Sequence, residues 1–564
     1  MKIPNTTTIN ILNNIVNIRH NEKVVYLNSI EYLYAFIRKF TLISKEWNEK
    51  VIPKLCPRNP FILDNYNRIE KSQLEFLIKS KIQFQVYLNL NIVNELDDLK
   101  TLIKDRVSTL HLSTVPNHFV VTGYPNLKSL LLSISESDQL EDLDDKNLEK
   151  HGIKLDLSLS PSDGLVDSRI HEYIFNMKAL SSFQLYDYHK DFIVLPNAPF
   201  YKTLKSLSLI SVFFDEYNHL EQLFKNLEIT EEIYISSLSF ISYPENMNEM
   251  LLDCLSNIKI TPTISNLTVE GVTATPWSSL IKLFNSLVSL KKFSMSTECF
   301  EPDSEELLIS QQTLDLLSLV TFEPSTCILP KISSLKCKSL IVSDLSNPDM
   351  ILDDLFPSPL LSNLMEFKFH NLNQFNSYSH NLSEFFNSLI RFNSENLKSI
   401  EVELGTNFYG NALVESISKN SNLKWLTIIS SDINSLVNLL KSLPLSIEYI
   451  KVNVLQVQKF EDFNTIVPHL QCNQSLKVFV IGDIQPSILT NNISYMPMCI
   501  EILSKNNHLS TLILPYSTMS TATNSDLESL EHILKSNTNL SHLYSSDKRV
   551  VSLMNKYLCL GGHE

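Results

Sequence analysis

The chain contains few of the residues that mark zinc-binding or disulfide-linked proteins. Its 564 residues include only eight Cys, and no two of them form a C-x-x-C pair. No group of Cys and His residues has the spacing of zinc ligands. We therefore expect reduced thiols, with Cys337 and Cys499 buried as small apolar residues of a repeat. The sequence predicts no metal site and no cofactor.

Long apolar runs are also missing. The first residues, MKIPNTTTIN, contain no apolar core of a secretory signal, and no stretch approaches the length of a membrane span. The chain has 47 Lys and Arg against 62 Asp and Glu, for a formal net charge of -15. Such a surface repels phosphate backbones and anionic membranes. We expect a cytoplasmic protein, with the nucleus as the alternative, that binds neither nucleic acid nor a membrane.

Motifs of catalysis are absent as well. Gly405 and Gly410 have the glycine spacing of a phosphate-binding loop, but Asn411 and Ala412 follow where that loop needs Lys and a hydroxyl residue. No G-x-S-x-G, H-E-x-x-H or kinase set occurs. The sequence predicts no catalytic residue, and we expect a protein that is not an enzyme. Glycine itself is scarce, at 9 residues, so we expect Asn to occupy left-handed turn positions.

What the chain does contain is a repeat. Three segments align without gaps, each with an apolar helical stripe, an Asn and then the spacing L-x-x-L-x-L: residues 413–428, 499–514 and 530–543. Looser copies of this spacing run upstream. From residue 397 onward, the close and loose copies together begin at 397, 423, 447, 476, 509 and 540. A strand and a helix that alternate many times predict parallel strands in one sheet with helices on one side.

With these features the chain resembles the leucine-rich repeat proteins, most closely the ribonuclease-inhibitor-like and cysteine-containing types, over residues 105–545. The resemblance implies an α/β fold: a curved right-handed solenoid with strands on its concave face and helices on its convex face. The Asn that usually follows the strand is mostly missing. The stretches 133–179 and 296–336 are too long for one repeat and hold either degenerate repeats or inserted loops; Ile153, Leu155 and Leu157 suggest a degenerate repeat in the first.

Outside the repeats we expect a helical region at 1–60, a connecting or capping segment at 61–104 and a C-terminal tail at 546–564. Residues 32–47 resemble the second half of a degenerate F-box, in which an apolar helix leads to L-V-C/S-K-x-W. That resemblance implies that Leu42, Ile43 and Trp47 contact a small adaptor of a cullin ubiquitin ligase. The alternative is an amphipathic cap that shields the apolar face of the first repeat.

The repeat register predicts a binding surface. If the second and third Leu positions point inward, the residues that flank them point to solvent, because side chains alternate along a strand. An apolar patch with charged neighbours is typical of a protein-binding hot spot. A one-residue slip would invert every side chain, and the tail 547–564 or a loop could instead cover the patch. The predicted patch consists of Trp425, Ile429, Tyr449, Val478, Val480 and Ile513, with Glu401 and Glu403 beside them.

We therefore expect a non-catalytic scaffold that binds protein partners on the concave face. If the F-box resemblance holds, the chain is a substrate-recognition subunit of a cullin ubiquitin ligase. The alternatives are a ligase-independent scaffold and an enzyme regulator or inhibitor, the latter by analogy with the repeat family alone.

Overall fold

The contacts of the chain define two compact units, and each is described here by itself. The first comprises Met1–Glu245 with Asn257–Thr268, and the second comprises Asn246–Ser256 with Val269–Glu564. The structure is a computed structural model, and it describes residues 9, 33–34, 37–38, 45–57, 60–63, 71–89, 101–113, 123–135, 143, 145–160, 174–187, 202–214, 216–240, 246–256, 263–271, 273–301, 309–310, 313–322, 332–343, 358–370, 380–392, 394–404, 409–485, 495–514, 522–537, 539–540, 542–545, 547–557 and 560–562.

The first unit alternates short helices with strands. In chain order its described elements are α3 (Lys45–Lys50), the 3-10 turn η2 (Ile52–Lys54), β1 (Phe61–Leu63), α4 (Lys71–Lys79), β2 (Val86–Asn89), η4 (Lys104–Arg106), β3 (Val107–Leu112), β4 (Ser129–Ile134), α6 (Asp145–Lys150), β5 (Lys154–Leu159), β6 (Leu180–Tyr186), β7 (Lys202–Ile210), β8 (Phe213–Phe214), α8 (Tyr217–Asn226), β9 (Leu227–Ser236) and β10 (Ser239–Phe240). Strand β11 (Asn266–Glu270) spans the division between the units.

The second unit has the same alternation with longer helices. Its elements are α9 (Met247–Ser256), β12 (Thr275–Pro276), α10 (Trp277–Ser286), β13 (Lys292–Thr297), β14 (Phe300–Glu301), β15 (Thr313–Thr321), β16 (Lys336–Ser343), α12 (Pro359–Asn363), β17 (Glu366–His370), α13 (His380–Arg391), β18 (Ser399–Leu404), α14 (Tyr409–Lys419), β19 (Trp425–Asp432), α15 (Ile433–Lys441), β20 (Tyr449–Gln456), α16 (Phe460–Phe463), η8 (Asn464–Ile466), α17 (Val467–Cys472), β21 (Val478–Gln485), α18 (Met496–Lys505), β22 (Thr511–Ile513), α19 (Asn524–Ser536), β23 (His542–Tyr544), α20 (Lys548–Lys556) and β24 (Leu560–Gly562).

Strands pair in parallel with their neighbours along the chain. The first unit has the order β1-β2-β3-β4-β5-β6-β7-β9. In the second unit the order is β13-β15-β16-β17-β18-β19-β20-β21-β22-β23-β24. Two neighbouring parallel strands need a crossover connection, and the chain between consecutive strands supplies it. The predicted α/β architecture with parallel strands is confirmed within each unit.

Each strand buries alternate residues, which fixes its register. In β19, Leu426 and Ile428 are buried while Thr427 between them is half-exposed, and in β21 Phe479 and Ile481 are buried in the same way. Burying a side chain of this size contributes roughly 1.5–3 kcal/mol, so a slip by one residue would expose several such side chains per strand. The inward positions therefore agree with the second and third leucine positions of the repeat.

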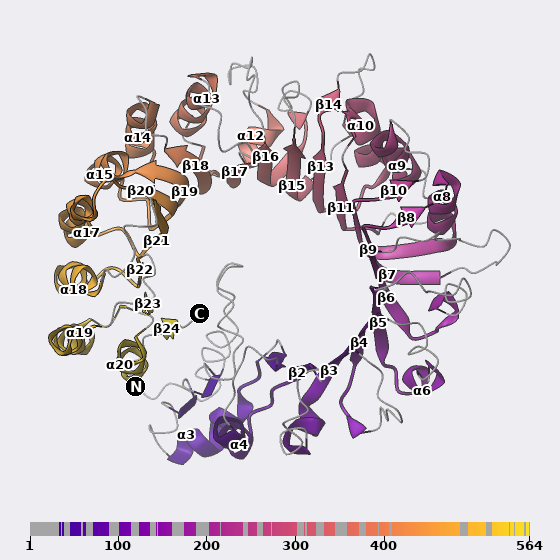
Figure 1. Cartoon of the computed structure of the whole chain (residues 1–564), viewed down its shortest axis with the longest axis horizontal. Coiled ribbons are helices and arrows are strands. Elements are labelled where there is room, and N and C mark those ends of the chain that lie inside the picture. The colour runs from indigo at the N-terminus through magenta and orange to yellow at the C-terminus, as the bar shows by residue number, and fades with distance from the viewer. Residues whose placement is uncertain are drawn as a thin grey trace. The chain divides into compact units, whose positions relative to one another are not determined.

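Helices cover the buried face of the sheet. In the second unit α14, α15, α17, α18 and α19 follow one another along one side of strands β18 to β23 (Figure 1), and consecutive helices are in contact. Helix α15 buries Leu436 and Leu439 completely. Its first turn is capped by Asp432, whose carboxylate accepts hydrogen bonds from the backbone N–H groups of Asn434 and Ser435. No helix among the described residues is both long and apolar enough to cross a membrane.

A buried Asn closes the turn from helix to strand in the repeats near the C-terminus. The side-chain carbonyl oxygen of Asn506 accepts hydrogen bonds from the backbone N–H groups of His508 and Leu509, at 2.8 and 3.0 Å. Its amide donates to the carbonyls of Leu470 and Asn473 in the preceding repeat, at 2.6 and 2.9 Å. Asn420 and Asn537 form the same two bonds to their own turns and also donate to the preceding repeat. The Asn of the sequence pattern therefore joins consecutive repeats.

Left-handed turns do not use this Asn. The described non-glycine residues with positive φ are Lys81, Asp187, Ser211 and Ser237. The expectation that Asn occupies these positions is wrong for the described residues. Asn420, Asn506 and Asn537 instead satisfy turns through their side chains, because the amide offers both an acceptor and a donor at one buried point.

Two strands lie where the repeat spacing had a gap. Strand β5 contains Leu155 and Leu157, and both are buried, as the suggestion of a degenerate repeat at this place requires. Strand β15 lies in the second gap, where Leu314 and Leu317 are buried. The ladder also begins earlier than residue 105, because β1 pairs in parallel with β2, and β2 pairs in parallel with β3.

Candidate protein-binding surface

Predicted surface residues lie in one row across the second unit's sheet. Trp425 of β19 pairs with Tyr449 of β20, and Tyr449 pairs with Val478 of β21. Adjacent strands are about 4.8 Å apart, so these three side chains are immediate neighbours on one face. Between β18 and β22 this row runs from Ser399 to Thr511.

A second row runs parallel to the first, two residues further along each strand. It consists of Glu401, Thr427, Lys451, Val480 and Ile513, which pair in that order from β18 to β22. All five side chains are half-buried. The predicted residues Glu401, Val480 and Ile513 are thus brought together, and Lys451 places a positive charge among them. We call these two rows, from Ser399 to Ile513, the exposed sheet face.

The aromatic residues of this face are accessible in different degrees. Trp425 is 38% exposed and is among the few large apolar side chains at the surface of the described residues. Tyr449 beside it is half-buried, and burial raises the pKa of its phenol. An indole that stays this exposed beside a partly buried tyrosine is a feature of interaction surfaces more than of cores.

Two predicted residues lie less clearly in the pattern. Ile429 is half-buried on β19; the ladder pairs Ile428 with Val452 and Ser430 with Val454, so Ile429 lies opposite Asn453, although these two residues do not form a ladder pair. The side chain of Glu403, on β18, is outside the described part of the structure.

The sequence interpretation missed a third row, at the position directly after the first leucine of each repeat. Its backbone N–H groups bond in register from strand to strand: Lys398 to Met365, Lys424 to Lys398, Glu448 to Lys424 and Lys477 to Glu448. Both residues between the first two leucines can be accessible: Lys424 and Trp425 are exposed, while Lys398 and Ser399 are half-buried. The signal was available, since Lys or Glu follows the first apolar position at residues 398, 424, 448 and 477.

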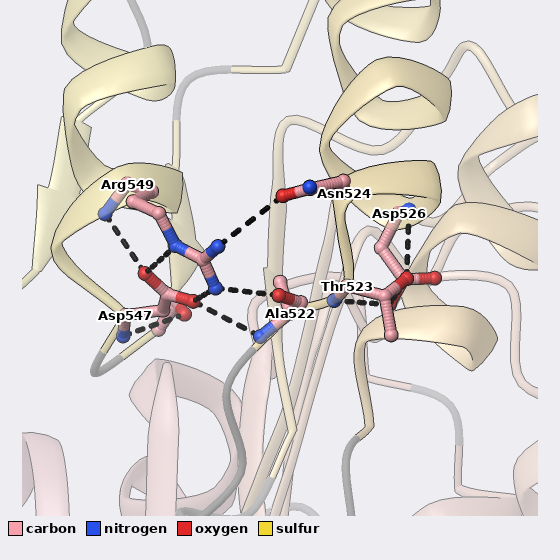
Figure 2. Close-up of polar contacts among 7 residues, drawn as sticks. Ala522, Thr523, Asn524, Asp526, Asp547 and Arg549 are labelled. Atoms are coloured by element: carbon pink, nitrogen blue, oxygen red, sulfur yellow. Dashed lines mark hydrogen bonds and ion pairs between the residues drawn. The ribbon is translucent and has the colours of Figure 1, made fainter.

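The described part of the C-terminal segment extends the repeats. Helix α20 packs beside α19, and β24 pairs with β23, so residues 547–557 and 560–562 add a further helix and strand to the array. The start of α20 is joined to the start of α19 by Asp547 and Arg549 (Figure 2). The Asp547 carboxylate accepts from the Ala522 N–H at 2.9 Å and from Arg549 Nη2 at 2.7 Å, while Nη2 also donates to the Ala522 carbonyl at 2.5 Å.

These contacts make the end of the array sensitive to acid. The Asp547 side chain is only 6% exposed, and the hydrogen bonds from Arg549 lower the pKa of its carboxyl. Because folding lowers this pKa, the ionised Asp547 carboxylate stabilises the folded state fully at pH values above the pKa of an unfolded Asp, about 3.9. This stabilisation is lost as the pH falls through the lower pKa of the folded state. We expect Asp547→Asn to lower the urea midpoint at pH 7 and to differ much less from the parent protein at pH 3. The control is Glu528→Gln, at an exposed position of α19. The prediction is contradicted if Asp547→Asn lowers the urea midpoint, relative to the parent protein, by the same amount at pH 7 and at pH 3.

At the N-terminus the F-box-like residues are only partly described. Trp47 lies on α3 and is half-buried, while Leu42 and Ile43 are outside the described residues. Next to α3, Val51 and Leu55 are fully buried, which is consistent with a helical cap at this end of the unit. The adaptor contact of Leu42, Ile43 and Trp47 therefore stays a prediction.

The cysteines of the described residues are free thiols. Cys337 and Cys499 are buried as expected, and burial raises the pKa of each to about 12. These two groups are therefore protonated near neutral pH and behave as small apolar side chains. In the part of the chain that the structure describes, no three His, Cys, Asp or Glu residues gather as ligands for a metal ion.

Comparison with family models gives no match for this chain, and comparison with curated proteins gives none either. The likeness to leucine-rich repeat proteins therefore remains a resemblance of residues and spacing.

Proposed function

We propose that the chain is a non-catalytic scaffold that binds a protein partner on its exposed sheet face. In this proposal each unit is a stretch of a curved right-handed leucine-rich-repeat solenoid, and the sheet forms its concave side. The observation that supports the proposal most is the exposure of Trp425 in one row with Tyr449 and Val478. Aromatic residues at the centre of an accessible patch supply much of the binding energy in protein interfaces.

The chemistry of the face is suited to a protein partner. Val478 adjoins Tyr449, Val480 and Ile513 pair further along the same face, and Glu401 and Lys451 place charges among them. An apolar centre with polar neighbours is the usual anatomy of a protein interface. The ligase subunit, the ligase-independent scaffold and the enzyme regulator are three forms of this function. The first depends on the F-box-like residues and is not favoured by a further observation.

The test is affinity capture with paired variants. We expect Trp425→Ala and Tyr449→Ala together to reduce recovery of the bound partner at least tenfold, because loss of a central aromatic residue costs about 2–4 kcal/mol of binding. The matched control is Leu445→Ser, which removes an apolar side chain that is 83% exposed between α15 and β20. Recovery is measured by quantitative mass spectrometry, and circular dichroism checks the fold. If the double variant and the control retain the same partners, the exposed sheet face is not the binding surface.

A further inference from the structure

Two lysines of the third row have no acidic partner in the part of the chain that the structure describes. Along this row Lys338 pairs with Asp315 at 2.7 Å, and Lys477 pairs with Glu448 at 2.7 Å. Between these two ion pairs lie Lys398 and Lys424, which have no ion pair or side-chain hydrogen bond with the described residues. In a chain with a formal net charge of -15, adjacent uncompensated lysines are an unusual local feature.

Exposed apolar side chains lie on both sides of these lysines. Met365 precedes Lys398 in the row, and its carbonyl accepts the Lys398 N–H at 2.9 Å; the side chain of Met365 is 48% exposed. Trp425 follows Lys424 directly and is bonded through its N–H to the Lys398 carbonyl at 3.0 Å. Positive charge and accessible apolar surface therefore coincide where strands β17, β18 and β19 begin.

We infer that this patch, comprising Met365, Lys398, Lys424 and Trp425, binds an acidic segment of a partner protein that also carries apolar side chains. The inference rests on the proposed function and specifies the chemistry of the partner. Carboxylates contact the two ammonium groups, while an aromatic or branched apolar side chain packs on Trp425 and Met365. Charge complementarity of this kind fixes the register of a partner and accelerates its association.

Spacing and surrounding charge support this assignment. Lys398 and Lys424 directly precede the paired strands β18 and β19, which are about 4.8 Å apart, and carboxylates two residues apart in an extended chain are separated by about 6.6 Å. Flexible lysine side chains span that difference. The nearby carboxylates of Glu366 and Glu448 are already bonded to Lys368 and Lys477, so they repel an acidic segment less than free carboxylates would.

A pair of synthetic peptides tests the inference on the full chain. Both are fluorescein-labelled and amide-capped, with twelve residues; one mixes Glu with Leu and Phe, and the other has Lys in place of Glu. We expect the acidic peptide to bind and the basic peptide not to bind, as measured by fluorescence anisotropy. The double variant Lys398→Glu with Lys424→Glu should weaken binding of the acidic peptide about tenfold or more, and rising salt should weaken it in the parent protein.

A second double variant controls for net charge. Lys146→Glu with Lys441→Glu makes the same charge change at exposed positions on α6 and α15, and it should bind the acidic peptide as the parent protein does. Equal binding of both peptides, no binding of either, or full binding by the Lys398 and Lys424 variant would overturn the inference. The proposed function would survive each of these results if the Trp425 and Tyr449 variant still loses its captured partner. Two other occupants are tested directly: lysine-dependent binding to phosphatidylserine vesicles, or a lysine-dependent dimer in light scattering, would also overturn the inference.

Discussion

Replacing Asn506 with Ala should lower the free energy of unfolding by about 2–4 kcal/mol. The side chain is 2% exposed and makes four hydrogen bonds, two to its own turn and two to the preceding repeat. Each such bond contributes about 0.5–1.5 kcal/mol, and a buried group left without a partner costs about 1–3 kcal/mol. The Leu509 N–H and the Leu470 carbonyl belong to buried residues and cannot readily turn to water.

The neighbouring residue is a close control. Asn507 lies in the same turn but is exposed, and its side chain forms no hydrogen bond with the described residues; its backbone carbonyl accepts from the Asn539 amide at 2.7 Å. Alanine at this position keeps that carbonyl, so Asn507→Ala should change stability by less than about 0.5 kcal/mol. Urea unfolding followed by circular dichroism compares the two variants. Equal midpoints for Asn506→Ala and Asn507→Ala would mean that the buried amide does not join the repeats.

Spacing of leucine residues predicts the sheet because the physical cause is local. A strand with one buried face needs apolar residues at every second position, so the residues around Leu426, Phe479 and Leu512 define both the strand and its direction. Strand β15 lies in the stretch 296–336, for which the sequence leaves degenerate repeats and inserted loops open, although Leu314, Leu317 and Leu319 have the same spacing. Strands β1 and β2 are short and lack that spacing, and their place depends on pairing with residues elsewhere in the chain.

The candidate surface could be predicted only in part. Trp425, Tyr449 and Val478 follow from side-chain alternation, which the ladder register reproduces. The lysines at 398 and 424 did not follow from the same rule, because two accessible residues stand between the first leucine and the second, and a strict alternation allows one. Glu448 and Lys477 form an ion pair, whereas Lys398 and Lys424 have no acidic partner among the described residues. This difference depends on distances between strands. No pattern within a single repeat contains that information.

Replacing Gly271 with Ala should be as damaging as the loss of Asn506, for the opposite reason. A Cβ atom at this buried position would lie 2.0 Å from the Asn248 side-chain oxygen, far closer than real contacts allow. Asn248 cannot easily move, because its amide donates to the Thr273 carbonyl at 2.6 Å and to the hydroxyls of Thr275 and Thr297 at 3.1 and 3.2 Å. Overpacking costs about 1–3 kcal/mol and a broken buried network costs a similar amount, so we expect a loss of about 3 kcal/mol.

A double-mutant cycle separates the steric cause from a general sensitivity of the segment. Asn248→Ala removes the atoms that the new methyl group would meet, so Gly271→Ala should cost much less in that background than in the parent chain. Gly123→Ala is the control for the substitution itself, because a Cβ atom there meets nothing within 4 Å. The four proteins of the cycle and the control are compared by their urea midpoints. A steric conflict must disappear with the atoms that cause it. If Gly271→Ala therefore costs the same stability in the parent chain and in the Asn248→Ala background, the close contact with Asn248 is not the reason for a glycine at position 271.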